Sequence, residues 1–323
     1  MISWVCRRLP PSIFACLISG MIFSTDYFPG NFPAEAQPGE RQRIVDLQKK
    51  TKPAIALPLS QYGALRAPTL QTAGLGSATR QVVEAAIAAA RQASKKVVEA
   101  ETVVRAAGRA ASLGREAARM AETGRAGYGT RNLYFDRSPC RYRGEIVNDQ
   151  AIGAGVMICP SEKLEGQFRN GKPDGLIVEE QLNAGYKGEY REGHRTGLGG
   201  DYSLRASDAY EGEFKDGRRV GLGIERDQDG SYPGRYGFYR DPHNARHRID
   251  MELLGTQDFQ GSHWAGKYGS YMGPKIACIL IKGAVLEGSV LDGYGAKFDA
   301  SGNVTEQGLY KVGILANGAG SPC

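Results

Sequence analysis

The sequence lacks a hydrophobic run long enough for an ordinary transmembrane helix. Its N-terminal apolar run, Ile13 to Phe23, covers eleven residues, about half of what a membrane-spanning helix needs. Charge of one sign is not concentrated either. The formal net charge is +6, and without the first 36 residues it is still +6 (39 Lys and Arg against 33 Asp and Glu). This mild bias has no basic stripe, and we therefore expect no nucleic acid as a partner.

Motifs that would indicate an enzyme or a cofactor site are also missing. The chain has no P-loop string, no GxSxG elbow and no CxxC pair, and its GxG steps lack the βαβ context of a dinucleotide site. His243 and His247 are spaced like metal ligands on a helix, with Asp241 or Asp250 nearby, but the glutamate of an HExxH motif is absent. A solvated loop explains them more simply. We predict no enzyme, no metal and no cofactor, with a metal-dependent enzyme as the weakest hypothesis.

Carboxylate pairs are the remaining candidates for chemistry. They occur at Glu179-Glu180 and at Glu211 and Glu213, and a glycan hydrolase could use such a pair in a groove. On a strand, however, Glu211 and Glu213 share one face. Solvation of the sheet is the simpler interpretation.

The first 36 residues resemble a secretory signal peptide. Arg7 and Arg8 precede the apolar run, and Ala34-Glu35-Ala36 matches an A-x-A cleavage signal. We predict cleavage after Ala36 and an exported protein, periplasmic or secreted. The alternative is an uncleaved segment that anchors the chain to a membrane.

Cleavage would leave an even number of cysteines. These are Cys140, Cys159, Cys278 and Cys323, and in an exported chain they permit two disulfides. Cys140 and Cys159 flank a predicted hairpin with Asn148-Asp149 as its turn. That register places Cys140 opposite Met157, with Cys159 one diagonal away. Cys278 with Cys323 follows only by elimination, and two free thiols are the alternative.

Two segments separate the signal peptide from the rest. Residues 37–76 are proline-rich and read as a disordered linker. Residues 77–125 are dense in Ala, Arg and Glu and predict a long helix, capped by Ser77 or Thr79 and weakened or broken at Gly108 and Gly114. Its narrow apolar stripe comprises Val83, Ile87, Ala90, Val97 and Val104.

Two uses of this helix compete. It forms an alanine-rich coiled coil that makes a homo-oligomer through residues 77–125, or it lies along the predicted sheet and covers the open edge or groove. Oligomerisation is slightly favoured. A membrane-surface helix is a third reading, but the apolar face has few Trp, Phe or Leu residues.

The C-terminal half contains an internal repeat. With Tyr210 as position zero, glycines fall at +2, +7, +11 and +13 (Gly212, Gly217, Gly221 and Gly223), and Phe214 lies at +4. The same frame from Tyr186 finds Gly188, Tyr190, Gly193, Gly197 and Gly199. Looser copies start at Tyr142, with Gly144, Ile146, Gly153 and Gly155, and at Leu164, with Gly166, Phe168, Gly171, Gly175 and Ile177 at +13.

Beyond residue 240 the pattern decays. Tyr232, Gly234 and Tyr236 begin a unit that does not finish, and Phe259, Gly261 and Gly266 begin another. Leu286, Gly288 and Val290 lead to Gly293 and Gly295 with about four residues missing. Gly308, Tyr310 and Gly313 read as a cap.

The glycines have a structural explanation in this frame. Tyr210, Gly212 and Phe214 share one strand face, and Asp216-Gly217 predicts a tight hairpin turn. A plain hairpin would place Gly212 opposite Gly221 and Tyr210 opposite Gly223, so that rings lie flat over bare backbone. The sequence therefore predicts a mainly β repeat fold, in which one elongated, twisted antiparallel sheet of stacked hairpins presents a shallow groove with an aromatic floor.

These units resemble MORN repeats, most clearly over 142–236 and at most over 140–323. The resemblance implies an elongated sheet that binds proteins or phospholipids and has no catalysis of its own. We expect an exported scaffold that binds a protein partner of unknown identity. Anionic phospholipid, bound through basic hairpin turns, is the alternative.

The residues predicted to act in binding are aromatic or basic. The rings are Tyr142, Phe168, Tyr186, Tyr190, Tyr210, Phe214, Tyr232 and Tyr236, and the basic residues near the turns are Arg191, Arg195, Arg218 and Arg219. The glycines with a structural role are Gly188, Gly197, Gly199, Gly212, Gly221 and Gly223.

Overall fold

The chain divides into two compact units, residues 1–52 and 53–323, in a computed structural model. In the first unit, the structure describes the paired strands β1 (Leu17–Ile18) and β2 (Met21–Ile22). In the second unit, it describes residues 70–203, 208–227, 230–240, 248–259, 262–270, 289–311 and 313–316. The helix and the sheet discussed below all belong to the second unit.

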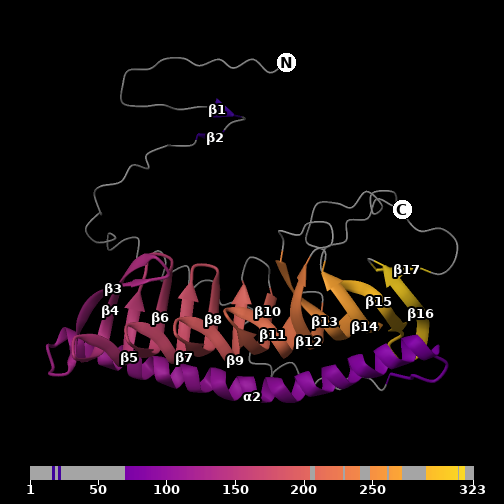
Figure 1. The fold of residues 1–323 in the computed structure, drawn as a ribbon, viewed down its shortest axis with the longest axis horizontal. Coiled ribbons are helices and arrows are strands. Elements are labelled where there is room, and N and C mark those ends of the chain that lie inside the picture. Colours follow the sequence, from indigo (N-terminus) through magenta and orange to yellow (C-terminus); the bar gives the residue numbers. More distant parts are fainter. Residues whose placement is uncertain are drawn as a thin grey trace. The chain divides into compact units, whose positions relative to one another are not determined.

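The described residues of the second unit form one helix and one sheet (Figure 1). Helix α2 (Ser77–Glu122) precedes a 15-stranded antiparallel sheet in which sequential strands are neighbours throughout. The strands are β3 (Tyr128–Phe135), β4 (Ser138–Val147), β5 (Gln150–Ile158), β6 (Glu162–Arg169), β7 (Lys172–Gln181), β8 (Ala184–Arg191), β9 (His194–Ser203), β10 (Asp208–Lys215), β11 (Arg218–Arg226), β12 (Gly230–Arg240), β13 (Arg248–Phe259), β14 (Ser262–Ser270), β15 (Ser289–Phe298), β16 (Val304–Lys311) and β17 (Ile314–Leu315). This confirms the predicted fold class. No helix among the described residues combines the length and apolarity that crossing a membrane requires.

The hairpin turns are as predicted, but the register is not. Lys215 pairs with Arg218, and Asp216 and Gly217 both have positive φ, as a type I′ turn requires. A β-bulge then follows between Gly212 and Glu213, so Gly212 lies opposite Gly223 rather than Gly221. The prediction assumed an uninterrupted ladder, whereas each of the hairpins β4–β5, β6–β7, β8–β9 and β10–β11 carries this bulge.

An acidic or amide side chain at +3 holds each bulge. The Glu213 carboxylate accepts the backbone N–H of Leu222 at 2.5 Å, and Glu189 does the same for Leu198 at 2.6 Å. The +11 glycine beside the carboxylate has a left-handed φ, 62° at Gly221, and a Cβ there would lie 2.2 Å from Glu213 Oε2. Glu213 is therefore a structural residue, and the interpretation that it only solvates the sheet is wrong.

The tyrosine at position zero explains the +13 glycine. The ring of Tyr210 lies so close to Gly223 that a Cβ on the glycine would be 2.2 Å from Tyr210 Oη. The Tyr210 hydroxyl lies within hydrogen-bond distance of two carbonyl oxygens, those of Glu213 at 3.2 Å and Val220 at 3.1 Å, and can donate to either. Ring contact with bare backbone is thus confirmed, and the ring also satisfies carbonyls that the bulge leaves free.

In the unit at Leu164, a different pair of side chains fills the same space. Leu164 replaces the tyrosine and Ile177 replaces the +13 glycine, and both are fully buried in the same core cluster. A shorter side chain at zero therefore leaves room for a longer one at +13.

The later units are more regular than the sequence frame indicated. Gly234 pairs with Gly255, so β12 and β13 complete the unit that was predicted not to finish. Gly266 pairs with Gly295, which puts Trp264 rather than Phe259 at position zero. A pattern with fixed spacing misses these units because their strands are joined by longer connections, which strand pairing tolerates at small entropic cost. Gly261, Leu286 and Gly288 lie outside the described residues.

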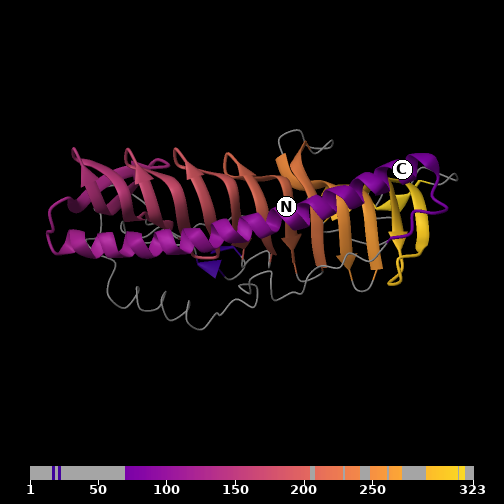
Figure 2. The ribbon, with the colours of Figure 1, turned by 90° about the horizontal axis from the view of Figure 1, so that it is seen from below.

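Helix α2 lies along the sheet (Figure 2), as one of the two hypotheses predicted. It packs on the face opposite the rings. It contacts every strand from β3 to β16. Its 46 residues give roughly 69 Å of length, close to the roughly 67 Å that fifteen strands span. Small residues dominate its buried stripe: Thr79, Val83, Ala86, Ala90, Ala93, Val97, Ala100, Ala107, Ala111 and Gly114.

The ends of α2 are fixed at opposite ends of the sheet. Gln307, in β16, accepts the Gly76 N–H at 2.9 Å and donates to the Gly74 carbonyl at 3.1 Å. Gly76 is the N-cap, so the predicted side-chain cap at Ser77 or Thr79 is wrong. At the other end, Glu122 pairs with Arg143 of β4. The last part of the predicted linker, residues 70–76, packs against the C-terminal strands through Leu70 and Leu75; residues 37–69 lie outside the described part of the chain.

The two helix glycines, predicted as breaks, lie inside an unbroken helix and differ in environment. A Cβ at Gly114 would be 2.4 Å from the Gly155 carbonyl oxygen, whereas one at Gly108 would meet nothing within 4 Å. We therefore expect Gly108→Ala to stabilise the protein by up to about 1 kcal/mol, since alanine favours helix. Gly114→Ala should destabilise it by about 2 kcal/mol because the helix must move off the sheet. Urea unfolding of this matched pair tests the close approach, and equal effects would contradict it.

Glu211 is half-buried where α2 meets β10. Burial raises the pKa of Glu211 to about 7; the nearby charges are Arg226, which lowers it, and Glu101 of α2, which raises it further. Between about pH 4.5 and pH 7 the folded protein therefore keeps a proton on Glu211 that the unfolded chain releases. The free energy of unfolding that this proton contributes is complete below pH 4.5 and is lost as pH rises to about 7. The free energy of unfolding of Glu211→Gln should exceed that of the native protein by at most about 3 kcal/mol at pH 8 and should equal it at pH 4. A gain independent of pH would refute the assignment.

Candidate binding surface

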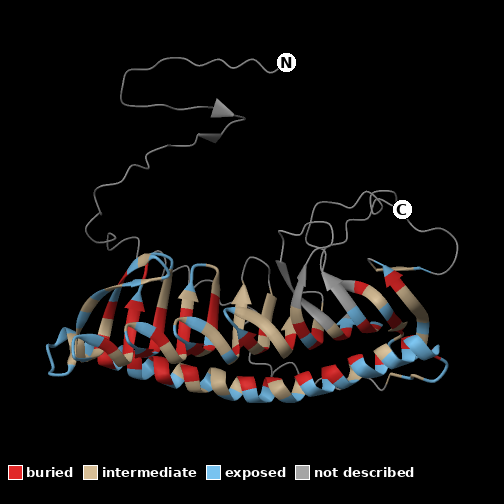
Figure 3. Cartoon of the chain, viewed as in Figure 1, coloured by how far each residue is buried: buried red, intermediate tan, exposed pale blue. Residues whose placement is uncertain are grey.

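The sheet has two unlike faces. We call the face packed by α2 the helix-side face and the face that carries Tyr142, Tyr186 and Tyr210 the ring-side face. The alternation of strand side chains separates them, because Ile224 contacts α2 while its neighbour Glu225, opposite Tyr210, points the other way. Figure 3 shows the buried residues concentrated along the sheet and on the inner side of the helix.

The predicted aromatic floor is buried rather than exposed. All eight rings predicted to bind are at most 7% exposed: Tyr142, Phe168, Tyr186, Tyr190, Tyr210, Phe214, Tyr232 and Tyr236. The expectation of an open groove over these rings is therefore wrong. They pack edge to face, with Tyr186, Phe214, Tyr210 and Tyr236 forming a continuous stack at centroid separations of 4.9–5.3 Å. This stack gives the ring-side face a rigid base.

Two of the four predicted basic residues belong to this base. The guanidinium of Arg195 lies 5.0 Å from the ring centroid of Tyr186, and that of Arg219 lies 5.3 Å from the Tyr210 centroid. Both arginines are engaged in buried ion pairs, so the interpretation of them as free turn charges is wrong. Arg191 is exposed. Arg218, at the next turn, is partly buried.

The ion pairs join successive repeats into what we call the charge ladder. Its ion-paired members are Glu179, Arg195, Asp201, Asp208, Arg219 and Glu225, and Glu162 joins it through the Glu179 carboxylate. Arg195 donates to both Glu179 oxygens, at 2.8 and 2.7 Å, from the following repeat. Arg219 reaches back to Asp201 in the same way, at 2.8 Å, and also contacts Asp208 and Glu225 at 3.0 Å each.

The charge ladder has an excess of negative charge. Five carboxylates face two guanidinium groups, and their pKa values reflect the imbalance. Burial and the Glu179 carboxylate raise the pKa of Glu162 to about 7, and burial also raises that of Glu225 to about 7, against the effect of Arg219. Burial acts on Glu179 in the same direction, but hydrogen bonds and attraction from Arg195 hold its pKa below the ordinary value.

A cleft of about 400 Å³ opens beside the ladder. The end of the β3–β4 hairpin forms one wall, with Tyr134, Phe135 and Asp136. The second and third repeats and the turn of the fourth, at Gly217, form the rest, including Glu162, Lys172, Glu179, Tyr190, Glu192 and Arg195. Phe135 approaches Gly193, where a Cβ would lie 3.0 Å from the ring. Tyr134 is 82% exposed, the most exposed large hydrophobic side chain among the described residues.

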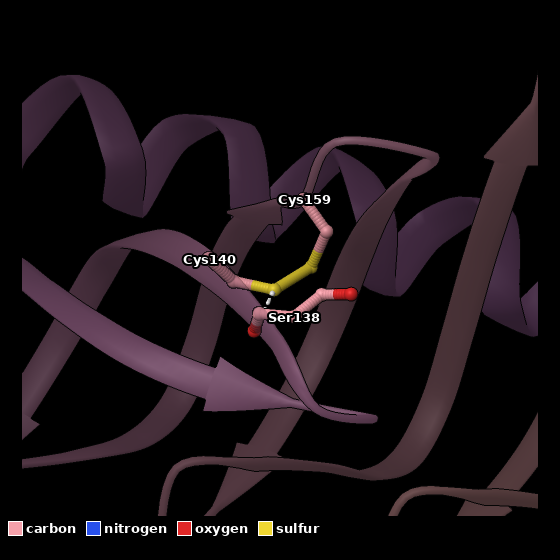
Figure 4. The surroundings of a disulfide bond; sticks show 3 residues. All are labelled: Ser138, Cys140 and Cys159. Carbon is pink, nitrogen blue, oxygen red and sulfur yellow. Dashed lines mark hydrogen bonds between the residues drawn. A yellow bond between two sulfur atoms is a disulfide. The ribbon is translucent and has the colours of Figure 1, made fainter. Parts of the chain in front are cut away.

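A disulfide fixes the strand that carries this wall. Cys140 and Cys159 are bonded, as predicted (Figure 4). The bulge places them directly opposite, since Arg141 pairs with Ile158 and Tyr142, rather than Cys140, pairs with Met157. The bond is compatible with an exported protein. Cys278 and Cys323 lie outside the described residues.

The histidines considered as metal ligands, His243 and His247, are not among the described residues. The residues that the structure describes hold no cluster of three metal-ligating side chains. Sequence reasoning missed the charge ladder, although a signal was present. Acidic residues recur at +15 (Glu179, Asp201 and Glu225) and arginines at +9 (Arg195 and Arg219).

An open sheet of bulged two-stranded units, each built on a ring over glycine, defines a class of repeat protein rather than a closed domain. The MORN repeat family matches at residues 165–176, 186–199 and 210–232. The chain therefore carries MORN repeats between residues 165 and 232, and such repeats generally serve as binding or scaffold modules, some of them at membrane phospholipids. No curated protein matches the chain.

Proposed function

We propose that the chain is an exported, non-enzymatic scaffold that binds a protein partner on its ring-side face. The observation that carries this proposal is the asymmetry of the sheet: α2 occupies the helix-side face along its length, while the ring-side face keeps a cleft whose lining includes the exposed Tyr134. Tyrosine with arginine and a rigid base is typical of protein-binding surfaces. The buried rings support that surface from below.

Crosslinking in cells tests this proposal directly. A photoreactive phenylalanine replaces Tyr134 or Lys172, both of which line the cleft, and in separate variants Val98 or Leu113, which are 62% and 59% exposed on α2. We expect a discrete crosslinked protein from the cleft positions only. Equal capture from the helix positions, or none from the cleft, would rule out a ring-side partner.

Anionic phospholipid is the alternative ligand. Two of its four predicted arginines, Arg195 and Arg219, are used in the charge ladder, and the ladder's excess carboxylates would repel phosphate. We therefore expect the mature protein not to float with anionic liposomes at low salt, where electrostatic binding is strongest. Salt-sensitive flotation that Arg191→Ala and Arg218→Ala abolish would establish the lipid function instead.

Homo-oligomerisation through residues 77–125 is a separate prediction. In the apolar stripe expected to form the coiled coil, Val83, Ala90 and Val97 are buried and Ile87 and Val104 are partly buried. An oligomer would therefore need the outer side of α2. Sedimentation of the native protein and of a Val98→Glu, Leu113→Glu variant tests it. A dimer lost in the variant would place the contact on that outer side.

A further inference from the structure

Among the described residues, the cleft has one half-buried carboxylate, Glu162, that lacks a cationic partner; Asp136 and Glu192, which also lack one, are exposed. No Lys, Arg or His nitrogen of the described residues lies within 4 Å of Glu162. Its neighbours are Gln181, which hydrogen-bonds to it, and Glu179. Glu179 is already bonded by Arg195, Tyr190 and Gln181. Ionised Glu162 therefore faces another carboxylate in a half-buried position, an arrangement that an incoming cation would relieve.

The walls of the cleft suit the rest of a basic side chain. The exposed Tyr134 and the partly buried Phe135 both line the cleft, and Asp136 and Glu192 add two exposed carboxylates. The ring-side face already stacks guanidinium groups on tyrosine rings at two places. Two cationic side chains of the lining, Lys172 and Arg195, would repel an incoming basic side chain, and His194 lies nearby. Lys172 is exposed, however, and Arg195 is neutralised by Glu179.

We propose that this cleft accepts a lysine or arginine side chain of the protein partner, held by the Glu162 carboxylate and the rings of Tyr134 and Phe135. The inference rests on the proposed function, because the basic side chain belongs to the partner on the ring-side face. A volume of about 400 Å³ admits one long side chain with part of its backbone. Arginine has the advantage of a planar group that can meet a carboxylate and a ring together.

Small blocked amino acids serve as probes for the full mature protein. Acetyl-arginine methylamide and acetyl-lysine methylamide carry the cation, and acetyl-norleucine methylamide has a similar apolar stem without it. In NMR titrations followed at the amides of β6, β8 and the β3–β4 turn, we expect millimolar binding of the two cations, at least about ten-fold tighter than norleucine binding. Equal binding of all three probes, or no binding of the cations, overturns the proposal.

Two substitutions locate the site. Glu162→Gln keeps the shape of the side chain and should weaken cation binding about ten-fold. Glu180→Gln is the matched control, because Glu180 lies on the opposite face and pairs with Lys163, and it should change binding less than about two-fold. Tyr134→Ala, at an exposed position that cannot unfold the sheet, should also weaken binding. Unchanged binding in both Glu162→Gln and Tyr134→Ala contradicts the assignment.

Crosslinking separates this proposal from the broader function. If partner capture from Lys172 persists in the Glu162→Gln protein while the cationic probes fail to bind the native one, the cation site is wrong and the ring-side scaffold stands. If no partner is captured in the native protein, the proposed function fails whatever the probes do.

Discussion

Replacing Gly223 by isoleucine is expected to destabilise the fourth repeat by about 4 kcal/mol. The new side chain would meet the Tyr210 ring, because even a Cβ at this position lies 2.2 Å from the Tyr210 hydroxyl oxygen and 2.3 Å from the adjacent ring carbon. Neither group can move freely, since Tyr210 is fully buried and Gly223 pairs with Gly212. Urea unfolding measures the loss, and hydrogen exchange at β10 and β11 locates it.

The second repeat predicts how this loss can be repaired. Leu164 and Ile177 occupy the positions of Tyr210 and Gly223 there, both fully buried. The double variant Tyr210→Leu, Gly223→Ile should therefore be more stable than Gly223→Ile alone, by about 2 kcal/mol, despite the two lost hydroxyl hydrogen bonds. Additive losses would show that the two positions do not share the space that their contacts indicate.

The mirror experiment uses the second repeat itself. Leu164→Tyr should be strongly destabilising alone and tolerated together with Ile177→Gly. This pair of variants controls for a general intolerance of substitution, because the double variant converts the Leu–Ile arrangement of the second repeat into the Tyr–Gly arrangement of the fourth.

Removing Arg219 should have an effect of similar size that depends on pH. Arg219 holds Asp201, Asp208 and Glu225, and its side chain is 15% exposed. Arg219→Met leaves Asp208 and Glu225 without a cation and Asp201 with Arg195 alone, at 3.9 Å, which should cost about 3–5 kcal/mol at pH 8. At pH 5 the loss should shrink, because the raised pKa values of Asp201 and Glu225 rise further without the arginine and let these groups protonate.

Thermal unfolding at pH 5 and pH 8 checks the pH dependence. Arg191→Met is the matched control, since Arg191 is exposed, and it should change stability by less than about 0.5 kcal/mol at either pH. An equal loss from Arg219→Met at both pH values would mean that Arg219 acts by packing on Tyr210 and not by charge.

The fold could be predicted from sequence because its signals are local. An Asp-Gly turn and the alternation around Tyr210, Gly212 and Phe214 specify a hairpin without reference to the rest of the chain. The bulge was missed because it depends on Glu213 reaching a backbone N–H on the partner strand, and no spacing in one strand shows that contact. The missed register in turn misplaced Cys140, which the bulge brings opposite Cys159.

The site was harder to predict because burial depends on neighbours. The rings were expected to be exposed, since one hairpin alone would leave Tyr210 open. In the array, however, Tyr236 and Phe214 pack on either side of it and Arg219 lies above. Likewise, the apolar stripe of α2 could have packed against a second helix or against a sheet. The close approach of Gly114 to the backbone of Gly155 shows that it packs against the sheet.

The most direct measurement is disulfide trapping between α2 and the sheet, because a helix-covered face is what leaves the ring-side face to the partner. Ala111 of α2 and Val178 of β7 belong to one buried cluster. In a Cys278→Ser, Cys323→Ser background, oxidation of the Ala111→Cys, Val178→Cys variant should give a monomer whose peptides are joined through positions 111 and 178. A dimer joined through position 111 of two chains, with no bond to position 178, would contradict this arrangement and favour the coiled coil.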